Sequence, residues 1–134
     1  RTSDGGVTWI PIDTGDTTIK GESAIDILAT SRIFQGREEP RTVLHAAGRV
    51  GGPTGILRSV DGGESWTVID MTEHAGMILD VKFFSEFEGL VFASSDRNPA
   101  AAEGLILRTS DGGKTWSEVY RSGRGGELIW KAQL

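Results

Sequence analysis

The sequence predicts an all-β fold built from four-stranded antiparallel sheets. A nine-residue phrase occurs three times, at residues 1–9, 58–66 and 108–116, and short runs of alternating apolar and polar residues flank it. No stretch keeps apolar residues at helical spacing without an intervening turn signal. The 19 glycines in 134 residues agree with a chain that is rich in tight turns.

The spacing of the three copies sets the size of the repeating unit. Asp4, Asp61 and Asp111 hold the same place in successive copies and lie 57 and 50 residues apart. This period is close to the roughly 40–50 residues of one four-stranded blade of a β-propeller. We therefore expect about two blades of a β-propeller. A closed ring takes about four to eight blades, so the chain is expected to be a fragment of a larger propeller.

With the phrase as anchor, all of residues 1–134 can be assigned to a partial propeller. Residues 1–13 contain the last strand of one blade, at residues 7–13. A complete blade spans residues 24–70, with strands expected at residues 24–30, 42–50, 55–59 and 65–70. A second spans residues 78–121, with strands expected at residues 78–84, 90–94, 105–109 and 115–121. Residues 127–134 begin the next blade.

The repeated phrase has the chemistry of a tight hairpin turn. In the second copy the Asp61 carboxylate can accept backbone N–H bonds, and Gly62 and Gly63 reach positive φ without a Cβ penalty. Ser or Thr two residues before each Asp, and again four residues after it, adds hydroxyl bonds that close the loop. The closing Trp covers the hairpin and its indole N–H finds a partner at the rim. Each Asp is therefore expected to be a structural cap.

These residues resemble the Asp-box, or BNR, repeat, written S/T-x-D-x-G-x-T/S-W, which occurs in sialidases, xyloglucan-cleaving glycosidases, sorting receptors and photosystem II assembly and stability factors. The matching residues are Thr2, Asp4, Gly6, Thr8, Trp9, Ser59, Asp61, Gly63, Ser65, Trp66, Thr109, Asp111, Gly113, Thr115 and Trp116. In that family the box lies between the third and fourth strands of a blade, away from the central site. The resemblance thus implies a propeller and brings no catalytic residue with it. The wider pattern is most similar to the photosystem II factors and related bacterial propellers.

A glycosidase would need two carboxylates at the ring centre, where the first strands lie. Asp26 and Asp80 hold similar places in segments 25–27 and 79–81 and are the only catalytic candidates in the pattern. The simpler interpretation is that each faces a wet channel or caps a strand. By resemblance, a sialidase would need an arginine triad and a Tyr–Glu pair, and the single tyrosine, Tyr120, falls on an expected outer strand. We therefore assign no catalytic residue.

Composition narrows the other possibilities. The hydrophobic share of 37% and charged share of 25% are ordinary for a soluble globular domain. The net charge of −5 argues against nucleic acid, the lack of cysteine excludes disulfides, and no apolar run approaches the ~20 residues of a membrane helix. His45 and His74 stand apart without metal-ligand spacing, so no metal and no cofactor are expected. The cellular compartment stays open, and an exported or periplasmic full-length protein is compatible with the sequence.

Four loops carry features that could suggest a function. Residues 13–16 are oxygen-rich, as in calcium loops, but lack the ligand alternation of an EF-hand, so a plain surface turn is expected. Residues 121–126 are rich in Arg and Gly, as in some RNA-binding segments, but occur once, so a linker is expected. Residues 35–41 and 96–103 contain Pro and both signs of charge, which is typical of solvated hairpin loops.

The regular scaffold positions and the lack of a convergent catalytic set favour a non-catalytic scaffold for protein interaction or assembly. Two alternatives stay open: part of a sialidase-like or xyloglucanase-like glycoside hydrolase whose site lies mostly in missing blades, or a sorting receptor. Whether the ligand is a protein or a glycan is not decided by the pattern. The chain starts inside a box without Met, so we expect an excerpt of a longer protein. Exposed blade faces, with open edges near Trp9 and Trp130, predict that the isolated chain is a homo-oligomer.

Overall fold

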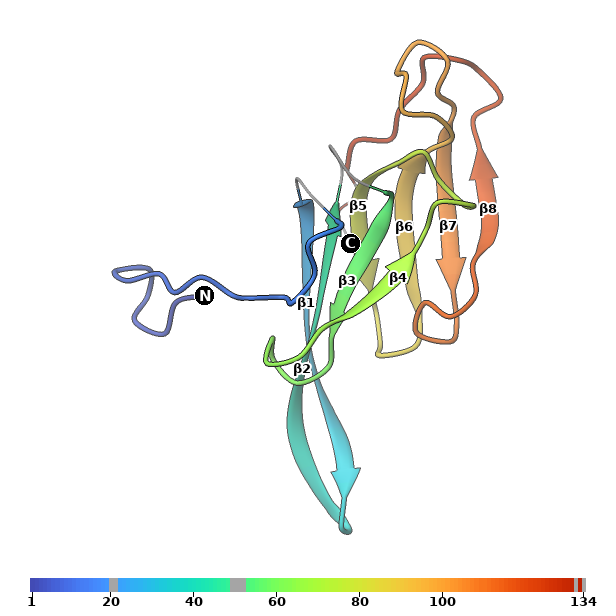
Figure 1. The fold of residues 1–134 in the computed structure, drawn as a ribbon. Helices are drawn as coiled ribbons and strands as arrows, with labels where there is room; N and C mark the ends of the chain where they lie inside the picture. Colours follow the sequence, from blue (N-terminus) through green and yellow to red (C-terminus); the bar gives the residue numbers. More distant parts are fainter. Residues whose placement is uncertain (20–21, 49–52, 132, 134) are drawn as a thin grey trace.

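The computed structural model describes residues 1–19, 22–48, 53–131 and 133, which form an all-β chain (Figure 1). Eight strands make two four-stranded antiparallel sheets, and in each sheet the strands lie side by side in chain order. Sheet 1 contains β1 (Glu22–Phe34), β2 (Arg37–Gly48), β3 (Gly55–Ser59) and β4 (Thr67–Asp70). Sheet 2 contains β5 (Met77–Phe83), β6 (Gly89–Ser94), β7 (Gly104–Thr109) and β8 (Ser117–Arg121). The described residues form no helix, and hence none that is long and apolar enough to cross a membrane.

The prediction of two four-stranded antiparallel sheets is confirmed, and each of the eight strands falls on a run expected from the sequence. The second run was expected to continue to residue 50, but residues 49 and 50 lie outside the described residues. Segment 96–103 connects β6 to β7 as a loop, and the N–H groups of Ala101 and Ala102 both donate to the carbonyl of Asn98. Alternating apolar runs bounded by glycine and turn residues were therefore sufficient to place these eight strands, although not all of their ends.

The first hairpin differs from the expected one. Residues 35–41 were predicted as a loop, but β1 and β2 continue pairing to Phe34 and Arg37 and are joined by Gln35 and Gly36 alone. Their φ angles of 50° and 74° fit the tight turns that suit the twist of a hairpin. We call the paired residues 31–41 the arm, and it extends beyond the rest of sheet 1 (Figure 1). Because β3 pairs only with residues 44–47 of β2, the arm is a two-stranded ribbon that tolerates the missing N–H of Pro40.

Two further predicted strands are not formed. Residues 7–13 and the described residues of segment 127–134 run as irregular chain, and residues 132 and 134 lie outside the described residues. A strand exists only through a ladder with a neighbour, and no described strand pairs with either segment. Instead, the two segments lie over the sheets: Ile12 reaches the box at Gly63, and Ile129 lies against Gly104.

The core lies between the two sheets, where β1 and β2 pack on β5. Ala47 and Ile56 of sheet 1 meet Ile78, Val81 and Val91 of sheet 2, and all five are fully buried. Within sheet 2, burial declines from β5, which is buried almost throughout, to β8, which is exposed throughout. The hydrophobic effect therefore holds the sheets together at their inner strands and leaves β4 and β8 as outer strands.

Candidate interaction site between the sheets

The three copies of the phrase, called boxes 1, 2 and 3 in chain order, fold into the same hydrogen-bonded turn. In box 2 the Ser59 hydroxyl donates to Asp61 Oδ1 over 2.7 Å, and the Ser65 N–H donates to the same oxygen over 3.0 Å. The indole N–H of Trp66 donates to the carbonyl of Gly63 over 3.2 Å. Boxes 1 and 3 repeat all three bonds at the matching residues. Boxes 2 and 3 join β3 to β4 and β7 to β8.

These bonds keep the box aspartates ionised. The hydroxyl of Ser65, followed by its backbone N–H, holds the pKa of Asp61 well below its ordinary value. Thr8 lowers the pKa of Asp4 in the same way, and Thr115 lowers the pKa of Asp111. A carboxylate that is bonded to its own loop and stays ionised at neutral pH is a poor general acid. The geometry therefore suits a turn cap.

Asp26 and Asp80 lie on either side of Lys82. The ammonium of Lys82 is 3.6 Å from Asp26 Oδ1 and 3.7 Å from Asp80 Oδ1. The other oxygen of Asp26 accepts the backbone N–H of Phe83 over 3.0 Å, and Asp80 accepts the N–H of Val81 over 3.0 Å. Both aspartates are buried. The cluster thus ties β1 to β5 through one ion pair and one hydrogen bond that cross between the sheets.

The two aspartates are not at equivalent positions, so the interpretation that gave them similar places is wrong. Counted across the strands from the arginine that opens each box, Asp26 of sheet 1 corresponds to Lys82 of sheet 2. Asp80 lies two residues earlier on β5, which has a register irregularity between Ile78 and Asp80. Equivalent positions in the two sheets therefore carry opposite charges, and this complementarity explains why they pair.

A second ionic network joins β2 and β3 of sheet 1 to the turn between β5 and β6 of sheet 2. Glu86, in the turn between β5 and β6, accepts a 2.6 Å bond from Arg41 of β2. Arg58 of β3 donates to the backbone carbonyl of Glu86 over 3.0 Å and lies 3.8 Å from its carboxylate. These three side chains are mostly buried, so the attraction is screened less than that of a surface pair. Two arginines of sheet 1 thereby bind the β5–β6 turn of sheet 2.

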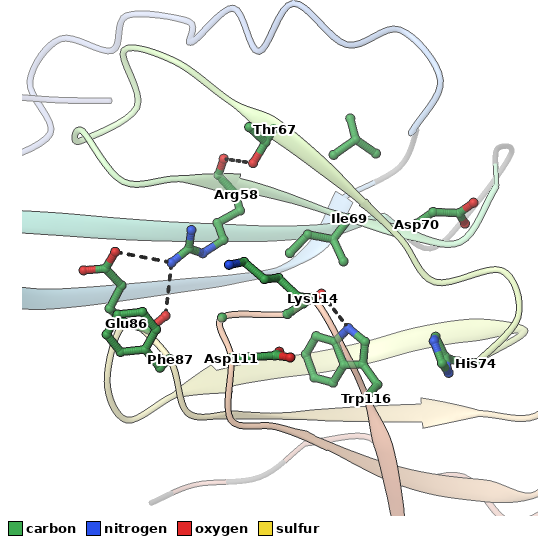
Figure 2. Close-up of a pocket in the computed structure, with 13 residues that line it drawn as sticks. Arg58, Thr67, Ile69, Asp70, His74, Glu86, Phe87, Asp111, Lys114 and Trp116 are labelled. Atoms are coloured by element: carbon green, nitrogen blue, oxygen red, sulfur yellow. Dashed lines mark hydrogen bonds and ion pairs between the residues drawn. The ribbon is translucent and has the colours of Figure 1, made fainter.

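Beside this network a groove of about 760 Å³ runs between β4 and box 3 (Figure 2). Ile69 and Asp70 of β4 form one side, and Lys114 and Trp116 of box 3 form the other. Phe87, at one end, is 58% exposed. Aromatic and aliphatic surface bordered by both signs of charge suits contact with a polypeptide segment. Arg58 and Glu86 of the ionic network also line the groove, and there they pair with each other.

The floor of this groove is a contact that occurs twice in the molecule. A Cβ at Gly113 of box 3 would lie 2.7 Å from the Cδ1 of Ile69, so only glycine lets Ile69 settle on the box. Likewise, a Cβ at Gly63 of box 2 would lie 3.7 Å from the Cδ1 of Ile12. Ile12 follows Trp9 by three residues, as Ile69 follows Trp66. Boxes 2 and 3 thus each receive an isoleucine from the segment that follows the preceding box.

The remaining predicted sites are ordinary turns or buried positions. Asp13 accepts the N–H of Gly15, and the Asp16 carboxylate accepts bonds from Thr18 and Ile19, so residues 13–16 satisfy their own loop. The side chain of His45 is buried, whereas His74 is exposed. Within the described ranges, no three His, Cys, Asp or Glu side chains gather into a set that could hold a metal ion.

Sequence reasoning missed two features of this interface. His45 stacks on Phe83 with ring centroids 3.6 Å apart and planes 5° from parallel. The groove joins residues of β4 and box 3 that are some forty positions apart, and no local pattern marks either feature. Comparison of the chain with protein-family models, with curated proteins and with solved structures gives no match.

Proposed function

We propose that the chain is a non-catalytic interaction scaffold made of stacked β-propeller blades of the Asp-box type. The observation that carries the proposal is an exposed apolar face on β1 of sheet 1. In sheet 2 the corresponding face, on β5, is buried. In register, Ile25 and Ile27 correspond to Val81 and Phe83. Val81 and Phe83 are 0% and 6% exposed, whereas Ile25 and Ile27 are 65% and 68% exposed. An exposed apolar face whose counterpart in the other sheet is buried by packing favours association over catalysis.

The opposite end of the stack supports the same proposal. Val119 of β8 follows Trp116 by three residues, as Ile69 follows Trp66. Ile69 lies on the next box, whereas Val119 is 54% exposed. One end therefore offers a bare isoleucine face and the other offers a bare outer strand. For the isolated chain, the occupant that fits both ends is a second copy that stacks head to tail, either as a dimer or as a closed ring of three or four chains.

Light scattering during size-exclusion chromatography tests this proposal. At micromolar concentration the chain is expected to have a mass above that of one copy, and the double variant Ile25→Lys, Ile27→Lys is expected to have the mass of one copy. Ile33→Lys is the matched control, because Ile33 is 73% exposed but lies on the arm, away from the stacking face. A monodisperse single-copy mass for the unaltered chain would overturn the proposed self-association.

A glycoside hydrolase is the alternative function from a different class. Its candidate acids, Asp26 and Asp80, both lie against Lys82 and both accept backbone N–H groups, which favours a structural role. We expect no hydrolysis of sialosides or β-glucans by the chain. Turnover that disappears in Asp26→Asn or Asp80→Asn would replace the scaffold proposal with a glycosidase.

A further inference from the structure

His45 is a buried titratable residue at the centre of the contact between the sheets. Its side chain is 0% exposed and lies flat on the ring of Phe83, with 3.6 Å between ring centroids. Neither Nδ1 nor Nε2 has a hydrogen-bond partner among the described residues. A neutral imidazole has one N–H donor, and a protonated one has two. Protonation in place would therefore add a charge and a second unmet donor inside the core.

Each carboxylate near His45 is already paired with another group, so none is free to accept a hydrogen bond from the N–H that protonation adds. On its own sheet, the ladder partners of His45 are Asp26 of β1 and Arg58 of β3. From sheet 2, Lys82 of β5 pairs with Asp26 and also lies 3.7 Å from Asp80. Glu86 of the β5–β6 turn is engaged by Arg58 and by Arg41, which lies on the same strand as His45.

We propose that His45 is an acid-sensitive contact between the two sheets, which stay packed while the imidazole is neutral and separate more easily once it can take up a proton. The physical reason is that sheet 1 and sheet 2 must part before the ring can reach water, since Phe83 covers one of its faces. This pH-dependent contact involves only sheets 1 and 2 of one chain, so the proposal does not depend on whether the chain self-associates.

The pH range of the effect follows from two values. Burial, with a smaller contribution from the charge of Arg58, lowers the pKa of His45 from 6.5 to about 3. The open or unfolded state keeps the ordinary value and binds the proton first, so stability is complete above pH 6.5 and is lost as the pH falls toward 3. Between pH 7.5 and pH 5.0 the unfolding equilibrium is expected to shift toward the open state roughly 30-fold, which is about 2 kcal/mol at 1.36 kcal/mol per tenfold.

His45→Leu is the variant best matched to this site. Leu90 holds the register position in sheet 2 that His45 holds in sheet 1, so leucine already occurs opposite the arginine that opens a box. Urea unfolding followed by circular dichroism at pH 7.5 and pH 5.0 is expected to show the shift in the unaltered chain and in His74→Gln. In His45→Leu the shift is expected to disappear. An equal shift in the unaltered chain and in His45→Leu overturns the proposal.

A second measurement needs no variant. The imidazole signals of His45 in the folded chain, followed by NMR from pH 7.5 to pH 5.0, are expected to stay fixed. Over the same range the Phe83 N–H, which bonds to Asp26 across the sheets, is expected to lose hydrogen-exchange protection. Titration of His45 near pH 6.5 in the folded chain, with Phe83 still protected, overturns the proposal even if His45→Leu fails to fold.

Discussion

Box 1 and box 3 have the same chemistry in different surroundings. The N–H of Thr8 reaches Asp4 over 2.9 Å in box 1, and the N–H of Thr115 reaches Asp111 over 2.9 Å in box 3. Box 3 joins two strands of a sheet and its Trp116 packs against the core, whereas box 1 is not flanked by strands and Trp9 is 71% exposed. The turn therefore forms from its own nine residues, and its contribution to stability depends on what lies against it.

The largest expected difference between the two boxes concerns their second glycine. Gly113→Ala places a non-glycine residue at φ of 89°, which costs about 1–2 kcal/mol, and pushes its Cβ against Ile69, which costs about 1–3 kcal/mol more. Gly6→Ala meets the same backbone strain at φ of 94° but has only Trp9 of its own box within 4 Å. Because box 1 is not flanked by strands, its turn can relax locally without unfolding the sheets, so urea unfolding is expected to show a large loss for Gly113→Ala and almost none for Gly6→Ala. Equal losses would mean that box 1 is part of the cooperative unit.

The next difference concerns the tryptophans. Trp116 is half-buried and meets Phe83 edge to face with ring centroids 6.4 Å apart. Trp116→Ala is expected to cost about 2 kcal/mol, below the 3–5 kcal/mol typical of a fully buried aromatic. Trp9→Ala removes a ring whose exposure is 71%, so thermal unfolding is expected to stay unchanged. A matching decrease in Tm for Trp9→Ala would show that box 1 packs on the sheets in solution.

The contrast between local and distant contacts also explains what the sequence could predict. The box bonds join residues at most four positions apart, so Asp4, Asp61 and Asp111 could be assigned as acceptors from the chain alone. The pairing of Asp26 with Lys82 could not, because it joins strands of two different sheets and no local pattern shows how the sheets pack. Likewise, the arm could not be distinguished from a loop. Both faces of its ribbon are exposed to solvent, so its residues lack the alternation of apolar and polar side chains that marks a half-buried strand.

The arm also shows the limit of composition as a guide. Charged residues and Pro40 suggested a loop, yet Arg32 pairs with Glu39 at 3.3 Å and Ser31 donates to Glu38 across the ribbon. Cross-strand pairs of this kind each contribute a few tenths of a kcal/mol to about 1 kcal/mol, which supports extended pairing without a hydrophobic face. Side-chain pairing, visible only once the register is known, thus stabilises what the sequence presents as a polar connection.

The smallest difference between the boxes is expected from their aspartates, and it depends on pH. Asn can accept through only one oxygen, so Asp111→Asn lowers the urea midpoint at pH 7, whereas Asp4→Asn leaves it unchanged because box 1 lies outside the sheets. The Thr115 bonds lower the pKa of Asp111 from 3.8 to about 2, so its stabilisation is present above pH 4 and is lost as the pH falls toward 2. The gap between Asp111→Asn and the unaltered chain should therefore narrow as the pH falls from 5 to 2. A gap that keeps its size at pH 2 would mean that the carboxylate acts through shape rather than charge, and the shared chemistry of the boxes would then need another explanation.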